Sequence, residues 1–229
     1  MSPRDRFVQL RDSAPLILPS FLQCHFGDLK QEVDSLTSGG MKALHLDVMD
    51  GHFVPNLTYG MPIVAGLNRL TDLPLDVHLM ISNPEQYVDQ FIEAGSDCVT
   101  IHIEATQDAP GLLDHIRSKG VAAGIAINPD TPMSELDGCV GKCDMVLVMS
   151  VNAGFGGQTF NEVALEKLQT ARQQFGPDVI LQIDGGVNAS TIDRCAKGGA
   201  ELLVVGSAIF KQDDYGVAMR ELLDLAVGV

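Results

Sequence analysis

The chain has no tryptophan and few basic residues. Its 229 residues include 15 Lys and Arg against 30 Asp and Glu, a formal net charge of −15 at pH 7. Nucleic acids and anionic membrane surfaces are bound through clustered Lys and Arg, so we expect neither as a partner. An anionic small molecule would also be repelled at long range, so a site that binds one must create its own positive potential.

Long apolar runs and targeting signals are missing as well. No stretch approaches the roughly 18 to 20 apolar residues of a membrane span. The initial segment, MSPRDRFVQLRDSAPL, has neither the apolar core of a secretory signal nor the basic, acid-free composition of a transit peptide. We therefore expect a cytoplasmic protein.

A disulfide framework is not indicated either, because the five cysteines are scattered and odd in number. Cys139 and Cys143 stand close together, as some metal ligands do. They have no second pair and no histidine cluster beside them, so we expect ordinary reduced cysteines.

What the chain does contain is a series of short apolar runs whose starts lie roughly 23 to 35 residues apart, the spacing of a strand plus a crossover helix. They cover residues 16–20, 43–48, 75–80, 98–104, 121–127, 144–150, 179–184 and 202–207. Eight such units without a linker predict one α/β domain over residues 1–229, a single (β/α)8 TIM barrel. Residues 1–14 precede the first unit and stay unassigned. An open doubly wound sheet is the alternative, but its G-x-G-x-x-G fingerprint after the first strand is missing.

Helix signals fill the intervals between these runs. In SNPEQYVDQFIEAG, Asn83 is expected to cap a helix that Pro84 begins, Gln86 to complete a capping box and Gly95 to end the helix. The segments TPMSELDG and NASTIDRCAKGG carry similar signals.

One predicted strand, LHLDVM, carries polar residues where a buried strand should be apolar. Successive strand side chains alternate between faces. Leu44, Leu46 and Val48 therefore share one face, and His45, Asp47 and Met49 share the other. A TIM barrel accepts polar side chains at its C-terminal mouth, where active sites lie, so we expect the His45 face to point there.

Other strands end in the same way, with His78 on the third and Asp184 on the seventh. Two histidines and two aspartates at strand ends predict a site for a divalent metal, for which Zn, Fe(II), Mn and Co all fit. His102 and Glu104 at the fourth strand are expected to support these ligands or to form a structural pair. His25, His52 and His115 are expected in loops or on the surface.

Glycine-rich turns follow the last three strands: NAGFGGQ at 152–158, DGGVN at 184–188 and VGSA at 205–208. Glycines let the backbone approach a ligand and turn its N–H groups toward an anion. None of the three turns contains Lys or Arg, so main-chain amides would bind a phosphate, as this barrel often does after strands seven and eight.

From about Pro15 to Phe210 the sequence resembles the ribulose-phosphate 3-epimerase family, through LHLDVMDGHFVPN, DVHLM, NPDTP, VNAGFGGQ, IDGGVN and VGSAIF in the family's order and spacing. The resemblance implies a metal held by His45, Asp47, His78 and Asp184. It implies proton transfer by Asp47 as acceptor and Asp184 as donor, with roles exchanged in reverse. Substrate contacts are implied for Ser20, His78, Gly154, Phe155, Gly156, Gly157, Asp184, Gly185, Gly186, Gly206 and Ser207, and a pocket lining for Met49, Met80 and Met149.

The implied reaction interconverts D-ribulose 5-phosphate and D-xylulose 5-phosphate at C3 through a 2,3-enediolate, in the pentose phosphate pathway. One divalent metal ion per subunit and a homo-oligomer are implied as well. Two positions depart from the family pattern: Ala153 replaces a proline, which is expected to loosen the loop, and Cys24 replaces a small residue.

Three alternatives remain at this point. An epimerase for a hexulose phosphate such as allulose 6-phosphate is the nearest, although GFGGQ and DGGVN favour the pentulose enzyme. A barrel lyase would need a lysine inside the mouth, and all seven lysines fall in expected helices, loops or strand edges. A non-catalytic phosphosugar-binding protein would not need both aspartates and both histidines.

Overall fold

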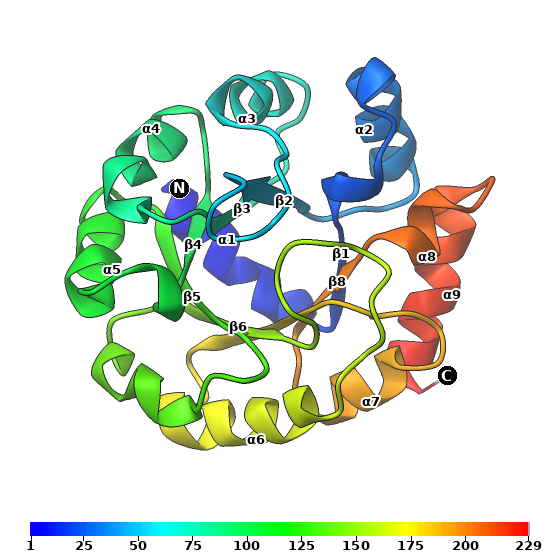
Figure 1. Ribbon diagram of the computed structural model, residues 1–229. Coiled ribbons are helices and arrows are strands. Elements are labelled where there is room, and N and C mark those ends of the chain that lie inside the picture. Colours follow the sequence, from blue (N-terminus) through cyan, green and yellow to red (C-terminus); the bar gives the residue numbers. More distant parts are fainter. Residues whose placement is uncertain (229) are drawn as a thin grey trace.

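The computed structural model describes residues 1–228, in which eight parallel strands form one nearly closed barrel surrounded by helices (Figure 1). The strands pair in the order β1-β8-β7-β6-β5-β4-β3-β2. Between β1 and β2 the barrel is closed by a parallel bridge from Ser20 to His45. The predicted TIM barrel is confirmed. The strands are β1 Leu16–Pro19, β2 Leu44–Met49, β3 Leu75–Met80, β4 Cys98–His102, β5 Ala122–Ile127, β6 Met145–Met149, β7 Ile180–Asp184 and β8 Leu202–Val205.

The ends of each predicted strand lie within two residues of the ends of an observed strand. The fourth ends at His102, because Ile103–Ala105 turn into a 3-10 helix that carries Glu104. The eighth ends at Val205, because Ser207 already begins a helix. Glu104 and Ser207 therefore belong to the turns above the barrel and not to its strands.

The helices around the barrel are α2 Leu29–Ser38, α3 Met61–Asn68, α4 Val88–Glu93, α5 Ala109–Ser118, α6 Val163–Phe175, α7 Ile192–Lys197, α8 Ser207–Phe210 and α9 Tyr215–Val227. The predicted capping box at Asn83 is wrong. Pro84–Gln86 form a 3-10 helix before α4, and the Asn83 side chain makes no capping hydrogen bond. The segment TPMSELDG likewise gives a 3-10 helix, Met133–Cys139. Within residues 1–228, no helix has both the length and the apolar character needed to cross a membrane.

The alternation predicted for β2 is confirmed. Leu44, Leu46 and Val48 belong to the apolar core between strands and helices. His45 and Asp47, on the opposite face, lie inside the barrel and are almost completely buried. The interior thus carries polar groups at the level where β2 ends.

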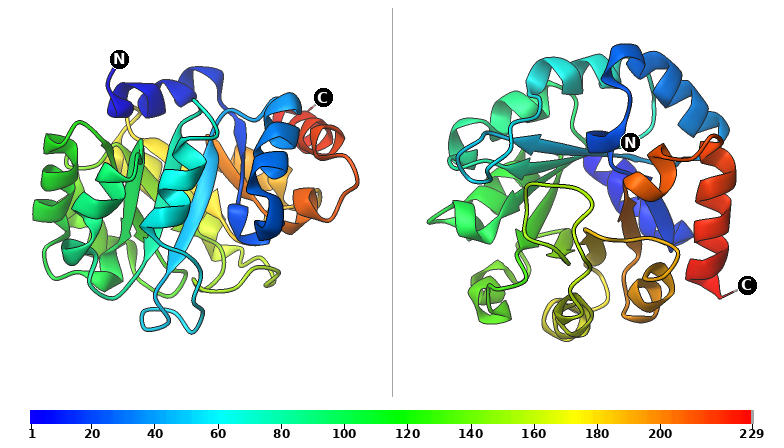
Figure 2. Two further views of the ribbon diagram at one scale, coloured as in Figure 1. Left: turned by 90° about the horizontal axis from the view of Figure 1, so that it is seen from above. Right: turned by 45° about the vertical axis from the view of Figure 1, so that its right-hand side comes forward.

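The unassigned residues at the N-terminus cover the bottom of the barrel. Helix α1 (Pro3–Val8) and a 3-10 helix (Gln9–Ser13) lie across one end, and the cyan segment after β2 projects from the other (Figure 2, left). Phe7 is fully buried among interior residues. Arg4 pairs with Asp144 at 2.7 Å and Arg6 with the buried Asp97 at 2.6 Å. This lead fills the end of the barrel opposite the mouth.

Candidate active site

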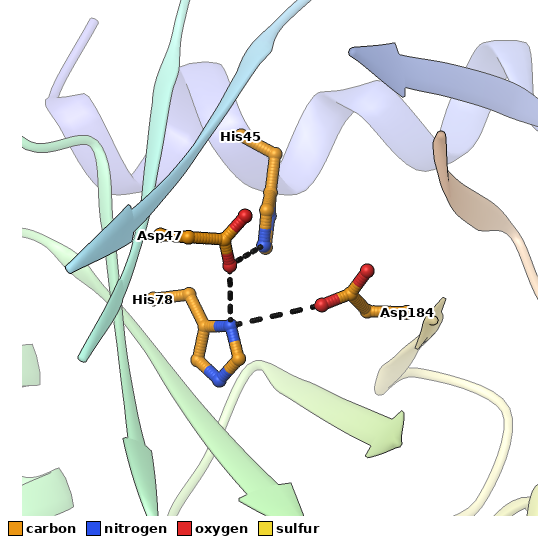
Figure 3. A group of neighbouring side chains, drawn as sticks. All are labelled: His45, Asp47, His78 and Asp184. Atoms are coloured by element: carbon orange, nitrogen blue, oxygen red, sulfur yellow. Dashed lines mark hydrogen bonds and ion pairs between the residues drawn. The ribbon is translucent and has the colours of Figure 1, made fainter. Parts of the chain in front are cut away.

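Strand register brings three of the predicted metal ligands together. Asp47 on β2 lies directly opposite His78 on β3, and His45 precedes Asp47 by two residues on the same face. Asp184 approaches from the end of β7, across from Asp47, and faces the same ring nitrogen of His78 (Figure 3). One possible ligand atom from each of the four residues lies within 4.8 Å of the other three. The four side chains form a compact group of two nitrogens and two carboxylates, which suits a first-row divalent metal.

Asp47 is the centre of this group. Its Oδ1 lies 3.2 Å from His45 Nε2 and 3.1 Å from His78 Nδ1, while its Oδ2 accepts a hydrogen bond from Ser20 Oγ at 2.6 Å. Asp184 Oδ2 lies farther away, 4.0 Å from His78 Nδ1. The two carboxylates therefore face the same ring nitrogen of His78, Asp47 from β2 and Asp184 from β7.

His45 is oriented from behind by a second carboxylate. Its Nδ1 lies 2.7 Å from Asp76 Oδ2, which also accepts a hydrogen bond from Gln182 Nε2 at 2.6 Å. A carboxylate only accepts, so Nδ1 donates. His45 Nε2 is then aimed at Asp47, and although buried it makes no hydrogen bond of good geometry. A ring nitrogen held in this way by a carboxylate is the usual arrangement of a metal-ligating histidine, so the residues fit a divalent cation.

Charges in this group shift the proton affinities. Burial opposes a charge on His45, but Asp47 and Asp76 outweigh burial and raise the pKa of His45 well above its ordinary value. Burial also opposes ionisation of Asp47, yet His45 and His78 hold the pKa of that carboxyl well below its usual range. Burial and the nearby Asp47 charge raise the pKa of Asp184 to about 7. Asp47 is thus held in its charged form, while the surroundings of Asp184 favour a proton on that carboxyl.

The carboxylates open into a cavity of about 200 Å³ at the barrel mouth. Ten of the predicted substrate contacts line it: Ser20, Gly154, Phe155, Gly156, Gly157, Asp184, Gly185, Gly186, Gly206 and Ser207. The predicted Met49, Met80 and Met149 line it too. His78 does not, because it is fully buried beneath the cavity floor.

Several lining residues were not predicted: Leu22, Gln23, Val151, Gln158, Val187 and Asn188. Gln158 and Asn188 belong to the glycine-rich motifs, so they could have been predicted from their place in the sequence. Gln23 lies in the 3-10 helix Phe21–Gln23 after β1 and carries no pattern of its own.

The turn after β7 needs its glycines. Gly185 has a φ of +103°, and a Cβ there would lie 2.4 Å from a methyl group of Val151. Within residues 1–228, the main-chain amides of Gly186 and Ser207 donate no hydrogen bond to the protein. Both residues line the cavity, so uncommitted N–H groups stand at its glycine-rich end.

Two loops meet beside the cavity. Asn56, in the loop after β2, donates its side-chain amide to Gly154 O at 2.8 Å. Ala153 donates its amide to Asn128 Oδ1 at 3.2 Å. Proline could not make that bond, so the departure at Ala153 adds an anchor to the loop after β6.

The remaining histidines separate into two groups. His102 Nε2 lies 2.8 Å from His78 Nε2, and His102 Nδ1 lies 3.0 Å from Glu104 Oε2. Burial lowers the pKa of His102 to about 4. His25 and His52 are exposed, and His115 pairs with Asp89 at 2.8 Å outside the barrel.

None of the residues that line the cavity is Lys or Arg. The buried Lys167 on α6 is held elsewhere, because its Nζ donates to Asn128 O at 2.6 Å and to Thr131 O. The mouth therefore lacks the amine that a Schiff-base lyase requires.

The family model described as ribulose-phosphate 3 epimerase family matches residues 16–210. The chain belongs to this family. A Bacillus subtilis (strain 168) protein named ribulose-phosphate 3-epimerase is 40% identical over 210 residues, which cover 90% of this chain and 97% of the relative. The chloroplastic ribulose-5-phosphate-3-epimerase of Arabidopsis thaliana is 41% identical over 221 residues, which cover 94% of this chain and 78% of the relative. The resemblance and the prediction of an epimerase of this family are confirmed.

Solved structures with the same fold are more distant in sequence. A 3-hexulose-6-phosphate synthase superposes with a TM-score of 0.71 at 16% identity, covering 92% of this chain and 99% of that chain. At such identity the likeness shows the barrel fold alone, and the chemistry must be argued from the site.

Proposed function

We propose that the chain interconverts D-ribulose 5-phosphate and D-xylulose 5-phosphate by epimerisation at C3. The main support is the position of two aspartates: Asp47 and Asp184 come from β2 and β7 and approach the same cavity from different sides. Inverting a carbon next to a carbonyl requires proton removal on one face and delivery on the other, which two opposed carboxylates can perform. Relatives at 40 to 42% identity carry the name of this reaction.

In one direction Asp47 takes the C3 proton and Asp184 returns one to the opposite face of a 2,3-enediolate. The unequal environments suit these roles, because His45 and His78 keep Asp47 ionised while burial favours a proton on Asp184. Ser20 Oγ, which donates to Asp47 Oδ2, holds the carboxylate in place. In the reverse direction the two aspartates exchange roles.

His45, Asp47, His78 and Asp184 would hold one divalent cation, with Zn, Fe(II), Mn and Co all compatible with the donor set. Such a cation supplies positive charge next to the oxygens on which negative charge develops. The protein's own contribution is the arrangement: two carboxylates are kept 4.8 Å or less from two ring nitrogens inside a buried pocket.

The glycine-rich end of the cavity would receive the phosphate. Gly186 and Ser207 offer main-chain amides that have no partner among residues 1–228, and an acidic protein needs such a local donor set. Met49, Met80 and Met149 would form an apolar wall that excludes water without offering an exchangeable proton.

The same geometry would serve a hexulose phosphate such as allulose 6-phosphate, which is the second candidate substrate. A lyase is disfavoured by the absence of Lys from the cavity lining. Cytoplasmic location, a role in the pentose phosphate pathway, a homo-oligomeric state and a single domain over residues 1–229 stay predictions.

The test is a competition assay. Protein reconstituted with a divalent metal is given D-ribulose 5-phosphate, allulose 6-phosphate or both, and the epimers are separated and quantified. We expect the pentulose to be turned over with the higher kcat/KM and activity to vanish on chelation. A higher kcat/KM for the hexulose would assign the chain to the second substrate. No turnover of either sugar would refute both candidate substrates.

A further inference from the structure

The side chain of Gln23 lies at the rim of the cavity without a partner in the protein. Gln23 ends the 3-10 helix Phe21–Gln23 that follows β1, is exposed and lines the cavity. Within residues 1–228 its carboxamide makes no hydrogen bond. A glutamine amide carries two N–H donors, so both are available to a ligand in the cavity.

This side chain runs toward the glycine-rich end of the cavity. A Cβ at Gly206 would lie 3.0 Å from Gln23 Cγ, so the stem of the side chain lies against the turn after β8. A Cβ at Gly156 would lie 2.7 Å from Gln23 Nε2, so the amide reaches the turn after β6. Ser207, which follows Gly206, has a main-chain amide that makes no hydrogen bond within residues 1–228. The Gln23 amide therefore lies between two of the glycine-rich turns, on the side of this main-chain donor.

The other polar side chains that could serve as amide or hydroxyl donors are mostly bound to the protein already. Gln158 Nε2 donates to two main-chain carbonyl groups of its own turn, at 2.7 and 2.8 Å. Asn188 Nδ2 donates to the carbonyl group two residues before it, at 2.8 Å. The Ser20 hydroxyl donates to Asp47. Of the three amide side chains in the cavity lining, Gln23 is thus the one that the described part of the protein leaves unused.

We propose that Gln23 binds the phosphate of the substrate through its side-chain Nε2. A hydrogen bond to an ionised acceptor such as phosphate is roughly twice as strong as one between neutral groups. The cavity lining contains no Lys or Arg, so this neutral amide adds a donor to the main-chain amides of Gly186 and Ser207. The inference rests on the proposed function, because that function supplies the phosphate.

Two substitutions separate a hydrogen bond from packing alone. Gln23→Met keeps the length of the side chain and removes the amide, while Gln23→Glu keeps the length and replaces the amide by a charge that repels phosphate. Both should fold, since Gln23 is exposed and its side chain makes no hydrogen bond within residues 1–228. Gln86→Met and Gln86→Glu are the matched controls. Gln86 also ends a three-residue 3-10 helix after a strand, β3, is exposed and lies outside the cavity lining.

The first readout is the affinity of metal-reconstituted protein for inorganic phosphate, measured by isothermal titration calorimetry. Loss of a hydrogen bond to a charged group weakens binding by ~10-fold or more. We expect such a loss for Gln23→Met and a larger one for Gln23→Glu, whose additional loss shrinks at high salt because ions screen the repulsion. Both Gln86 variants should bind phosphate as the wild type does. Ser207→Asp should weaken binding as well, which places the bound phosphate at the glycine-rich end.

Equal phosphate affinity of Gln23→Met and Gln86→Met overturns the inference. Equal affinity of Gln23→Met and Gln23→Glu at low salt overturns it too, because a charge in contact with phosphate would be felt. Unchanged affinity in Ser207→Asp has the same consequence, since the phosphate then binds away from Gln23.

The second readout is kinetic. Gln23→Met should raise KM for D-ribulose 5-phosphate by ~10-fold and leave kcat almost unchanged, because a bond to the phosphate is made in the ground state and the transition state alike. An unchanged KM overturns the inference. The titration with inorganic phosphate uses no sugar. Phosphate binding through Gln23 without turnover of either sugar would therefore refute the proposed function alone, and full turnover with unchanged phosphate affinity in Gln23→Met would refute this inference alone.

Discussion

Asp47 and His78 are directly paired across the parallel strands β2 and β3, and Asp47 Oδ1 lies 3.1 Å from His78 Nδ1. Parallel register places them at the same height in the barrel, and the two-residue period of each strand turns both side chains inward. His45 and Asp184 complete the group from the level below and from β7. The proposed chemistry depends on this pairing, since it puts a carboxylate and an imidazole side by side under the cavity.

Replacing either aspartate by asparagine should remove turnover. We expect Asp47→Asn and Asp184→Asn each to lower kcat by ~100-fold or more, the typical contribution of a positioned acid or base. The circular dichroism spectrum should not change, because asparagine keeps the size of the side chain. Asp178→Asn, at a side chain that is 97% exposed, is the control. Near-normal turnover by either site variant would contradict the two-carboxylate mechanism.

A negative charge at the glycine-rich end should repel the phosphate. Ser207 lines the cavity at the start of α8, and a carboxylate there would meet a phosphate at close range. Ser207→Asp should raise KM for D-ribulose 5-phosphate by ~10-fold or more. Ser118→Asp, on the exposed end of α5, should leave KM unchanged. If the two variants have the same KM, the phosphate binds elsewhere.

The N-terminal lead should stabilise the barrel without taking part in catalysis. Phe7 is fully buried at the end opposite the mouth. Phe7→Ala should lower the free energy of unfolding by about 3 to 5 kcal/mol, the usual cost of deleting a buried aromatic ring. Leu225→Ala, at a side chain 40% exposed, should cost much less. Urea denaturation of both variants checks this, and equal losses would mean that Phe7 does not support the barrel.

His102 should make the metal-free protein less stable in acid. Its pKa is about 4 in the folded chain, against 6.5 ordinarily. The unfolded chain therefore binds a proton first as the pH falls, and the stability that His102 contributes is present above pH 6.5 and lost toward pH 4. The loss is at most about 1.4 kcal/mol per pH unit.

To test this, the free energy of unfolding of the wild type is compared with that of His102→Gln by urea denaturation in the presence of a chelator. The raised pKa of His45 also makes the free energy of unfolding depend on pH, in the opposite direction. This contribution is the same in the wild type and the variant, so it cancels in the difference between them. We expect the free energy of unfolding of the wild type, relative to that of the variant, to fall as the pH is lowered from 6.5 to 4. Parallel curves would show that His102 is not held neutral.

Much of the barrel and the group of His45, Asp47, His78 and Asp184 could be predicted, because the alternation of side chains along a strand is a local property of the sequence. Alternation within LHLDVM separates His45 and Asp47 from the apolar face without any knowledge of the fold. The glycines in 152–158 and 184–188 indicate that these segments are turns. These features depend only on residues that are close together in the sequence, so sequence patterns can predict them.

Other features depend on contacts across the barrel. Asp76 orients His45 and is itself held by Gln182, a residue 106 positions away. Nothing in either strand distinguishes these two side chains from incidental polar residues. The role of the N-terminal lead was also beyond prediction, since Phe7, Arg4 and Arg6 find their partners only at the end of the barrel opposite the mouth. The capping signal at Asn83 failed because a 3-10 turn precedes α4.

The central claim, proton transfer at C3 by two carboxylates, is tested most directly by solvent exchange. Metal-reconstituted protein is incubated with D-ribulose 5-phosphate in D₂O, and the product is examined by NMR and mass spectrometry. We predict D-xylulose 5-phosphate that carries deuterium at C3, because the returning proton comes from an aspartate in exchange with solvent, and we predict that labelling stops in Asp47→Asn. Product that retains only protium at C3 would contradict the account.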